Sequence, residues 1–178
     1  ESGAFLREAL TFELALTYSE WLYVPELVWL PDSSAVRLVA PAHDPLLDPT
    51  QVSTFWNVPV SGSPSVLTTF VAAPVFVSFP YIAPDGGTVA YMSGITDTWT
   101  IHTITSSGVD WTFAGFPSGN AGLTGWSPDS LHFMYWTPDT RTVHLAGTDL
   151  DLLLGDTPFA NRVQWVDYFR YLYLNDQE

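Results

Sequence analysis

Short runs of β-branched and aromatic residues alternate with turns along most of the chain. Three such runs, residues 35–40, 88–92 and 131–136, each follow a Pro-Asp dipeptide, which itself follows an apolar or aromatic stretch. Proline presets φ for the first central position of a type I turn, and the aspartate side chain bonds the backbone two residues on. The pattern therefore predicts the same strand, turn and strand three times.

These predicted turns are separated by a loose period. Their residues are Pro31, Asp32, Pro84, Asp85, Pro128 and Asp129, and a degenerate fourth copy has Val166 and Asp167. From Asp to Asp the spacing is 85 − 32 = 53, 129 − 85 = 44 and 167 − 129 = 38 residues. Each hairpin is followed by another strand, a Gly-bearing turn and a last short apolar run. Four strands at this period are typical of a β-propeller blade.

The turn residues also resemble a known repeat. Trp126-Ser127-Pro128-Asp129-Ser130 is similar to the W-S-P-D-G signature of TolB-like (WD40-like) propellers, and weaker copies surround Asp85 and Asp32. The resemblance covers roughly residues 27–176 and implies an all-β propeller, or propeller fragment, of four-stranded antiparallel blades. It places about three to four blades in this chain, as repeats at roughly 27–70, 79–115, 123–156 and 160–178, with 1–26 from a preceding blade.

Helix signals are confined to the beginning of the chain. Residues 4–16 contain good helix formers, but Thr11, Phe12 and the aromatic residues that follow continue the β character, so we expect one or two strands there. We interpret residues 41–49, with Asp44 and Asp48, and residues 116–125, with three glycines, as loops.

Composition narrows the function classes. Against 5 Lys+Arg stand 19 Asp+Glu, and a net charge of −14 opposes binding to nucleic acid or to an anionic membrane surface. The absence of cysteine excludes disulfides, thiolate metal sites and a cysteine nucleophile. No window approaches ~18 uninterrupted apolar residues, as a membrane-spanning helix needs. Because the first residue is Glu1, we expect that an upstream segment was removed.

No catalytic motif emerges, so we predict no catalytic, cofactor-binding or metal residues and no enzyme. A serine hydrolase elbow, G-x-S-x-G, is missing, and Ser93-Gly94 and the serines around Gly62 are interpreted as turns. His102 and His144 occupy matching repeat positions, which favours a packing role over a metal site. For His132, a strand residue with one satisfied ring nitrogen is favoured.

Acidic and aromatic residues leave two alternatives open. Asp149, Asp151 and Asp156 could bind Ca²⁺, but their spacing is not that of a calcium loop, and a solvated acidic loop is favoured. Trp29, Trp126 and Trp165 recur at one repeat site and are expected to pack between blades. The less regular tryptophans would form a binding platform only if they share a rim, and core packing is favoured for each. These possible binding aromatics are Trp56, Trp99, Trp111 and Trp136.

The sequence thus predicts a non-catalytic propeller scaffold that mediates protein–protein interaction in an extracytoplasmic assembly, which is periplasmic, at the cell surface or secreted. The resemblance implies this location, since the family includes the periplasmic TolB protein. The alternative is an accessory propeller domain of a serine peptidase or of a carbohydrate-active enzyme. Because an arc of a propeller leaves unpaired edges and apolar faces, a protein partner or neighbouring copies are expected to complete it.

Overall fold

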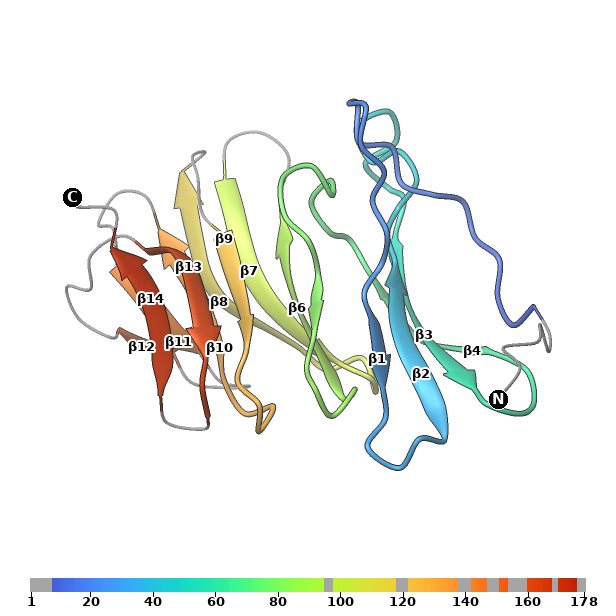
Figure 1. Cartoon of the computed structure of the whole chain (residues 1–178). Helices are drawn as coiled ribbons and strands as arrows, with labels where there is room; N and C mark the ends of the chain where they lie inside the picture. Colours follow the sequence, from blue (N-terminus) through green and yellow to red (C-terminus); the bar gives the residue numbers. More distant parts are fainter. Residues whose placement is uncertain are drawn as a thin grey trace.

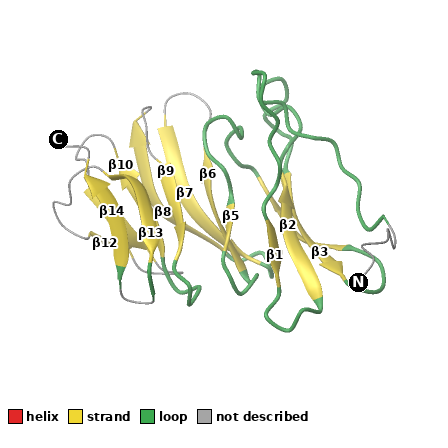
Figure 2. Cartoon of the chain, viewed as in Figure 1, coloured by secondary structure: helices red, strands yellow, loops and turns green. Residues whose placement is uncertain are grey.

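The computed structural model describes residues 8–94, 98–117, 122–137, 142–146, 151–153, 160–167 and 170–175. Over these residues the chain is all-β, with three four-stranded antiparallel sheets and one two-stranded sheet (Figure 1). Figure 2 shows that strands and loops account for all of the described chain. Within the same residues no helix is long and apolar enough to cross a membrane.

In each four-stranded sheet, neighbouring strands are consecutive in the chain and run antiparallel. The first sheet contains β1 (Leu27–Trp29), β2 (Ala35–Ala40), β3 (Ser53–Pro59) and β4 (Ser65–Phe70). The second contains β5 (Tyr81–Ile82), β6 (Thr88–Ser93), β7 (Thr98–Thr105) and β8 (Asp110–Pro117). The third contains β9 (Gly122–Trp126), β10 (Phe133–Thr137), β11 (Thr142–Ala146) and β12 (Asp151–Leu153), and the last pair is β13 (Ala160–Trp165) and β14 (Tyr171–Asn175). The predicted four-stranded antiparallel sheets are confirmed.

The three Pro-Asp turns have the same conformation. In each, the residue after the aspartate donates its N–H to the carbonyl oxygen three residues back, at 2.8, 2.8 and 3.0 Å in chain order. This residue, Ser33, Gly86 or Ser130, has a positive φ in every copy, at 58°, 73° and 64°. The aspartate carboxylate accepts the N–H two residues on, at 2.9, 2.8 and 3.0 Å. Each turn therefore joins the first two strands of its sheet in the same way.

Successive sheets pack face to face and enclose two apolar layers. Between the first and second sheets, Val39, Phe55 and Phe70 contact Val89 and other residues of the second sheet. Between the second and third sheets, the second sheet contributes a further set of buried side chains, and the third contributes Leu123, Trp126, Phe133 and Tyr135. The first strands lie near one another, because β5 contacts β9 and β9 contacts β13. The sheets thus follow one another in space in the same order as in the chain (Figure 1).

The prediction of strands near the N-terminus is wrong for the described residues 8–26, which hold no strand. The chain bends at residues 18–21, and there the Thr17 hydroxyl donates to the carbonyl oxygen of Trp21 at 2.6 Å. Single hydrogen bonds attach the segment to a loop, from Leu16 N to His43 O at 2.8 Å and between His43 Nδ1 and Leu14 O at 2.6 Å. With such isolated contacts the segment is not part of any sheet.

A second correction concerns residues 116–125, which we expected to form a loop. Within them β8 continues to Pro117 and β9 begins at Gly122, so the described ends of this stretch are paired in sheets. The interpretation treated the glycines as loop residues. Gly122 and Gly125 instead both lie in β9, and Gly125 has a φ of 125°. A register shift between Met134 and Tyr135 of the partner strand accommodates this backbone.

Candidate functional site

Trp126 shows how one sheet binds the next. It is 8% exposed and its Nε1 donates to the carbonyl oxygen of Tyr81, at the start of the second sheet, at 2.8 Å. Its ring packs on Phe133 at 5.3 Å between centroids. A second contact joins the turns themselves, because Asp85 N donates to Ser130 Oγ at 2.8 Å. As expected for this tryptophan, it packs between neighbouring sheets.

Trp29 occupies the same repeat position, three residues before the turn aspartate, but it is 58% exposed. The expectation that it packs between sheets is wrong for the described residues, which place no sheet against it. Its strand neighbour Leu27 is 62% exposed. Trp165, two residues before Asp167 at the end of β13, is half-buried.

The face that carries Trp29 is apolar across three strands. Cross-strand pairing joins Trp29 to Val36, Leu27 to Leu38, and Leu38 to Trp56. Paired residues lie on the same side of a sheet, so these side chains share one face. The opposite face carries Val39 and Phe55 and packs on the second sheet. The residues of this outer surface, called the open face below, are Leu27, Trp29, Val36, Leu38 and Trp56.

The N-terminal segment covers only part of the open face. A hollow of about 310 Å³ lies between this segment and the first sheet, and its lining includes Phe12, Glu13 and Trp56. Leu38 is buried, whereas Leu27 and Trp29 remain more than half exposed. The uncovered apolar area therefore lies along β1, at the start of the first sheet.

Three of the four predicted binding aromatics have described side chains, and these lie in the first and second sheets. Trp56 lies on the open face, and Trp99 is partly buried against the core between the second and third sheets. Trp111 is paired with Thr103 in the second sheet and is also half-buried. Trp136 belongs to β10, and its side chain lies outside the described residues. Trp99 and Trp111 share one face of the second sheet, because Thr103, the partner of Trp111, lies on the same side of β7 as Trp99, whereas Trp56 belongs to the first sheet.

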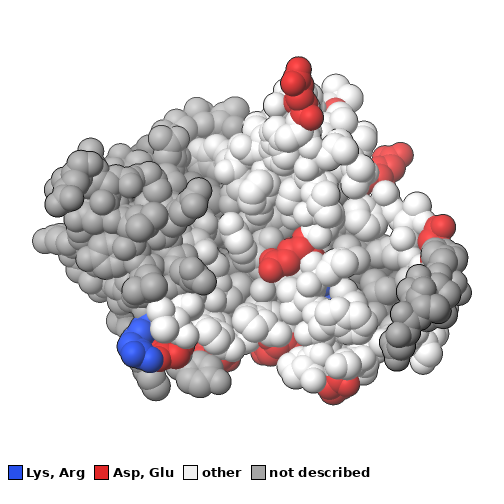
Figure 3. Space-filling model, in the orientation of Figure 1, with Lys and Arg blue, Asp and Glu red and all other residues white. Residues whose placement is uncertain are grey.

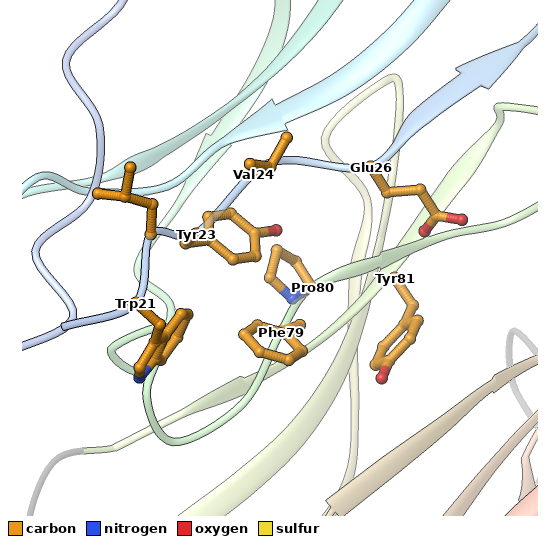
Figure 4. Close-up of a pocket in the computed structure, with 8 residues that line it drawn as sticks. Trp21, Tyr23, Val24, Glu26, Phe79, Pro80 and Tyr81 are labelled. Atoms are coloured by element: carbon orange, nitrogen blue, oxygen red, sulfur yellow. The ribbon is translucent and has the colours of Figure 1, made fainter. Parts of the chain in front are cut away.

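An aromatic cavity that the sequence analysis missed lies where the chain enters the first and second sheets (Figure 4). It measures about 340 Å³, and two chain segments supply its walls. Tyr23 stacks on Phe79 at 5.3 Å between centroids, and Trp21 meets Phe79 edge to face at 6.1 Å. The lining residues are Trp21, Leu22, Tyr23, Val24, Glu26, Phe79, Pro80 and Tyr81.

Burial raises the pKa of two groups that line the cavity. It raises the pKa of Tyr23 to about 12, with a smaller contribution from the negative charge of Glu26. It also raises the pKa of Glu26 above its ordinary value. The cavity thus offers an apolar, aromatic lining with a single carboxyl group, which suits an apolar side chain accompanied by a cationic or hydrogen-bond-donating group.

The described surface around these features is acidic. Asp and Glu side chains are spread over the face shown in Figure 3, while Lys and Arg appear only in small patches. This distribution agrees with the 19 acidic and 5 basic residues of the sequence. Electrostatics at these surfaces therefore favours a cationic or neutral partner.

No cation site is formed by the described residues, in which no group of three or more His, Asp or Glu side chains could hold a metal ion. Asp151 lies in β12, and Asp149 and Asp156 of the predicted calcium cluster lie outside the described residues.

His102, for which we expected a packing role, has two polar partners. Its Nε2 lies 2.8 Å from Ser93 Oγ and its Nδ1 3.2 Å from Thr112 Oγ1.

The interpretation of Ser93-Gly94 as a simple turn is only half right, because Ser93 is the last residue of β6 and only Gly94 follows the strand. Alternation in residues 88–93 places Tyr91 and Ser93 on one face. That pattern was readable in the sequence. The pairing of Tyr91 with His102 was not, because it depends on the register between β6 and β7.

No protein-family model matches the chain, and no curated protein matches it by sequence. Among solved structures it is similar to TolB from Acinetobacter baumannii, at 14% identity and a TM-score of 0.48, over 78% of this chain and 33% of that one. It is also similar to two proteins described as putative 6-phosphogluconolactonases. The protein from Bacteroides fragilis has 12% identity and a TM-score of 0.42, over 85% of this chain and 39% of that one. The protein from Bacteroides uniformis has 12% identity and a TM-score of 0.43, over 85% of this chain and 41% of that one.

The chain spans 33% to 41% of the length of these three structures. Two of them are described as enzymes, which contradicts our prediction that a chain of this kind is not an enzyme. The correction has a physical reason, because sheets of this type form a scaffold on which different sites are built. At 12% identity the likeness assigns no activity to this chain.

Proposed function

We propose that this chain is an arc of a β-propeller that acts through protein–protein association, with its open face as the main contact surface. A further four-stranded sheet, contributed by a second copy of the chain, packs on the open face. The observation that carries the proposal is the contrast between Trp126, 8% exposed, and Trp29, 58% exposed, at the same position of two repeats.

The contact between the second and third sheets suggests the geometry of this association. There the residues four and six positions after the turn aspartate, Phe133 and Tyr135, are 1% and 0% exposed against the preceding sheet. The corresponding residues of the first sheet are Val36 and Leu38, on the open face. A preceding sheet would remove Trp29 and Val36 from water in the same manner, and apolar burial supplies the free energy of such contacts.

The aromatic cavity adds a second contact for a partner at the same end of the molecule, because Glu26 directly precedes β1. A partner segment with an apolar side chain for the cavity and a Lys or Arg for Glu26 fits its chemistry. We assign the assembly to a location outside the cytoplasm, on the basis of the resemblance between the Pro-Asp turns and the TolB-like signature.

Sedimentation velocity and light scattering of the purified chain over a wide concentration range test the proposal. We expect association that increases with concentration and that Trp29→Ser weakens by at least about tenfold, because the variant removes a large aromatic anchor. Leu131→Ser is the matched control, since Leu131 is 59% exposed but lies in the turn of the third sheet. A stable monomer of ordinary solubility, or equal effects of both variants, would contradict the proposal.

A further inference from the structure

Three side chains on one face of the second sheet form a serine, imidazole and carboxylate relay. Ser93 ends β6, His102 lies in the middle of β7 and Asp110 begins β8. Ser93 Oγ lies 2.8 Å from His102 Nε2, and His102 Nδ1 lies 3.6 Å from Asp110 Oδ1. A hydroxyl bonded to an imidazole that a third group orients is the arrangement that activates a serine nucleophile on unrelated folds.

Strand register brings these residues together. Tyr91 pairs with His102 and Ser93 with Thr100, so both β6 side chains lie on the same face as the imidazole. On the other side, a register shift after Ile101 sets His102 opposite Thr112 of β8. Asp110 is two residues before Thr112 and shares its face. Three adjacent strands thus contribute one side chain each to the relay.

Contacts around the ring fix its orientation. The Tyr91 ring stacks on the imidazole at 4.9 Å between centroids, with an interplanar angle of 11°. Thr112 Oγ1 lies 3.2 Å from Nδ1, and the Tyr91 hydroxyl donates to Asp110 Oδ2 at 3.2 Å. With a proton on Nδ1 directed at Thr112 and Asp110, the lone pair of Nε2 faces Ser93. This tautomer is the one that general-base catalysis requires.

The protonation state agrees with this geometry. Burial lowers the pKa of His102, and the negative charge of Asp110 opposes that shift without cancelling it. The imidazole is therefore neutral near pH 7 and able to accept a proton. Among the described residues in contact with it, Asp110 and Tyr91 are the titratable ones. Tyr91 stays protonated, because burial raises its pKa well above the ordinary value.

We propose that Ser93 is a nucleophile toward acyl groups and that the chain hydrolyses small, neutral esters at this site. Ser93 Oγ attacks the carbonyl carbon while its proton passes to His102 Nε2. The bond to the leaving oxygen then breaks, and that oxygen takes the proton from Nε2. Water, which gives its proton to His102 Nε2, then attacks the acyl carbon. The bond from that carbon to Ser93 Oγ breaks and Oγ takes the proton back from Nε2, so that ester and water give acid and alcohol.

Size and charge restrict the substrate class. Ser93 is half-buried, and the side chain of His102 is 14% exposed, so water and ligands have limited access to both side chains and a small acyl group is favoured. Phe70 packs on Tyr91 at 4.3 Å between centroids, and Ala73 N donates to Met92 O at 2.7 Å, so the first sheet and the chain that follows it border the site. The nearby carboxylate of Asp110 disfavours anionic esters.

A fluorophosphonate probe on the complete chain, followed by peptide mass mapping, tests this directly. Attack on the probe forms an Oγ–P bond, breaks the P–F bond and sends the proton to His102. We expect modification at Ser93 in preference to exposed serines such as Ser65, and none at that position in Ser93→Ala. His102→Gln should slow the modification by about 100-fold or more, as loss of a general base does. The pH profile should rise to a plateau with a midpoint below 6.5.

Asp110→Asn provides the second variant, because this side chain is 42% exposed and its replacement keeps the shape. We expect a slower modification by about tenfold or more, and a midpoint at still lower pH, because the charge that favours the imidazolium is lost. Hydrolysis of p-nitrophenyl acetate should follow the same order of variants. Equal labelling of Ser93 and Ser65, or a rate at Ser93 unchanged in folded His102→Gln or Asp110→Asn, would overturn the proposal.

Discussion

The two tryptophans that precede the first and third Pro-Asp turns have opposite environments. Trp126 is buried against the second sheet and bonds the carbonyl oxygen of Tyr81, whereas Trp29 is largely exposed on the open face. Their local sequences predict the same strand and the same turn, and the turns do share their hydrogen bonds. The difference arises from the neighbour, because the third sheet follows another sheet and the first does not among the described residues.

This contrast teaches that a repeated motif defines local geometry, while burial requires the adjacent copy. Each repeat presents an apolar face that it cannot cover alone. Gly86 and Ser33 illustrate the same point at the turn. Gly86 is buried against Leu30 and Arg37, whereas residues 31–34 around Ser33 are all exposed.

The largest expected effect comes from removing the buried tryptophan. Trp126→Ala should lower the free energy of unfolding by about 3 to 5 kcal/mol, through a cavity and a lost hydrogen bond. Trp29→Ala should change it by less than about 1 kcal/mol at concentrations where the chain is a monomer, because 58% of the residue is then exposed to water. Urea unfolding of both variants measures the difference. Equal losses would show that Trp29 is covered in solution.

The turn position gives the next test. A Cβ on Gly86 would lie 2.5 Å from Leu30 Cδ2 and 2.8 Å from Arg37 Cγ, at a φ of 73°. Gly86→Ala should therefore cost about 1 to 3 kcal/mol, from backbone strain and displaced neighbours. Ser33→Ala should stay within about 0.5 kcal/mol. The same unfolding measurement applies, and a neutral Gly86→Ala would contradict the packing of this turn on the first sheet.

Alkaline titration probes the N-terminal segment beside the open face. The pKa of Tyr23 is raised by burial to about 12, so its protonated form is preferred in the folded state. The resulting stabilisation, about 1 kcal/mol after screening, is fully present below pH 10 and is lost as pH rises through 12. Tyr23→Phe keeps the stacking on Phe79 and removes this dependence. Unfolding of both proteins between pH 9 and 12 should therefore differ in slope, and parallel curves would contradict the prediction.

The smallest expected effect is a gain. Ser33 has a φ of 58°, a conformation that costs a side-chain-bearing residue about 1 kcal/mol relative to glycine. Ser33→Gly should stabilise the fold by about 0.5 kcal/mol. Ser130→Gly should bring no gain, because Ser130 Oγ accepts the N–H of Asp85 at 2.8 Å. The unfolding temperatures of the two variants measure the difference between the exposed turn of Ser33 and the turn of Ser130, which contacts the preceding sheet.

Much of the sheet structure was predictable, because alternating strands and turn residues are local signals. The run at residues 35–40 forms β2 as predicted, and that at 88–92 forms β6 with one added residue. The N-terminal segment was not predictable in this way. Its β-like composition does not make a strand without a sheet edge to pair with, and the chain bends at residues 18–21 instead, where the Thr17 hydroxyl bonds the backbone.

The candidate sites were harder to predict than the fold. The aromatic cavity combines Trp21 and Tyr23 with Phe79, more than 50 residues away in the chain. The relay of Ser93, His102 and Asp110 depends on the register of three strands and on one shift in it. Sequence spacing alone cannot supply either, because a slip of one residue moves a side chain to the other face.

The all-β class, the three equivalent turns and the acidic charge can be derived from the amino-acid sequence alone, because they depend on residue type and on contacts a few residues apart. Tertiary packing selects which apolar faces are covered, which aromatics meet across the entry to two sheets, and which serine faces a histidine. Those outcomes depend on sheet-to-sheet packing and strand register, where residues distant in the chain compete for the same neighbours.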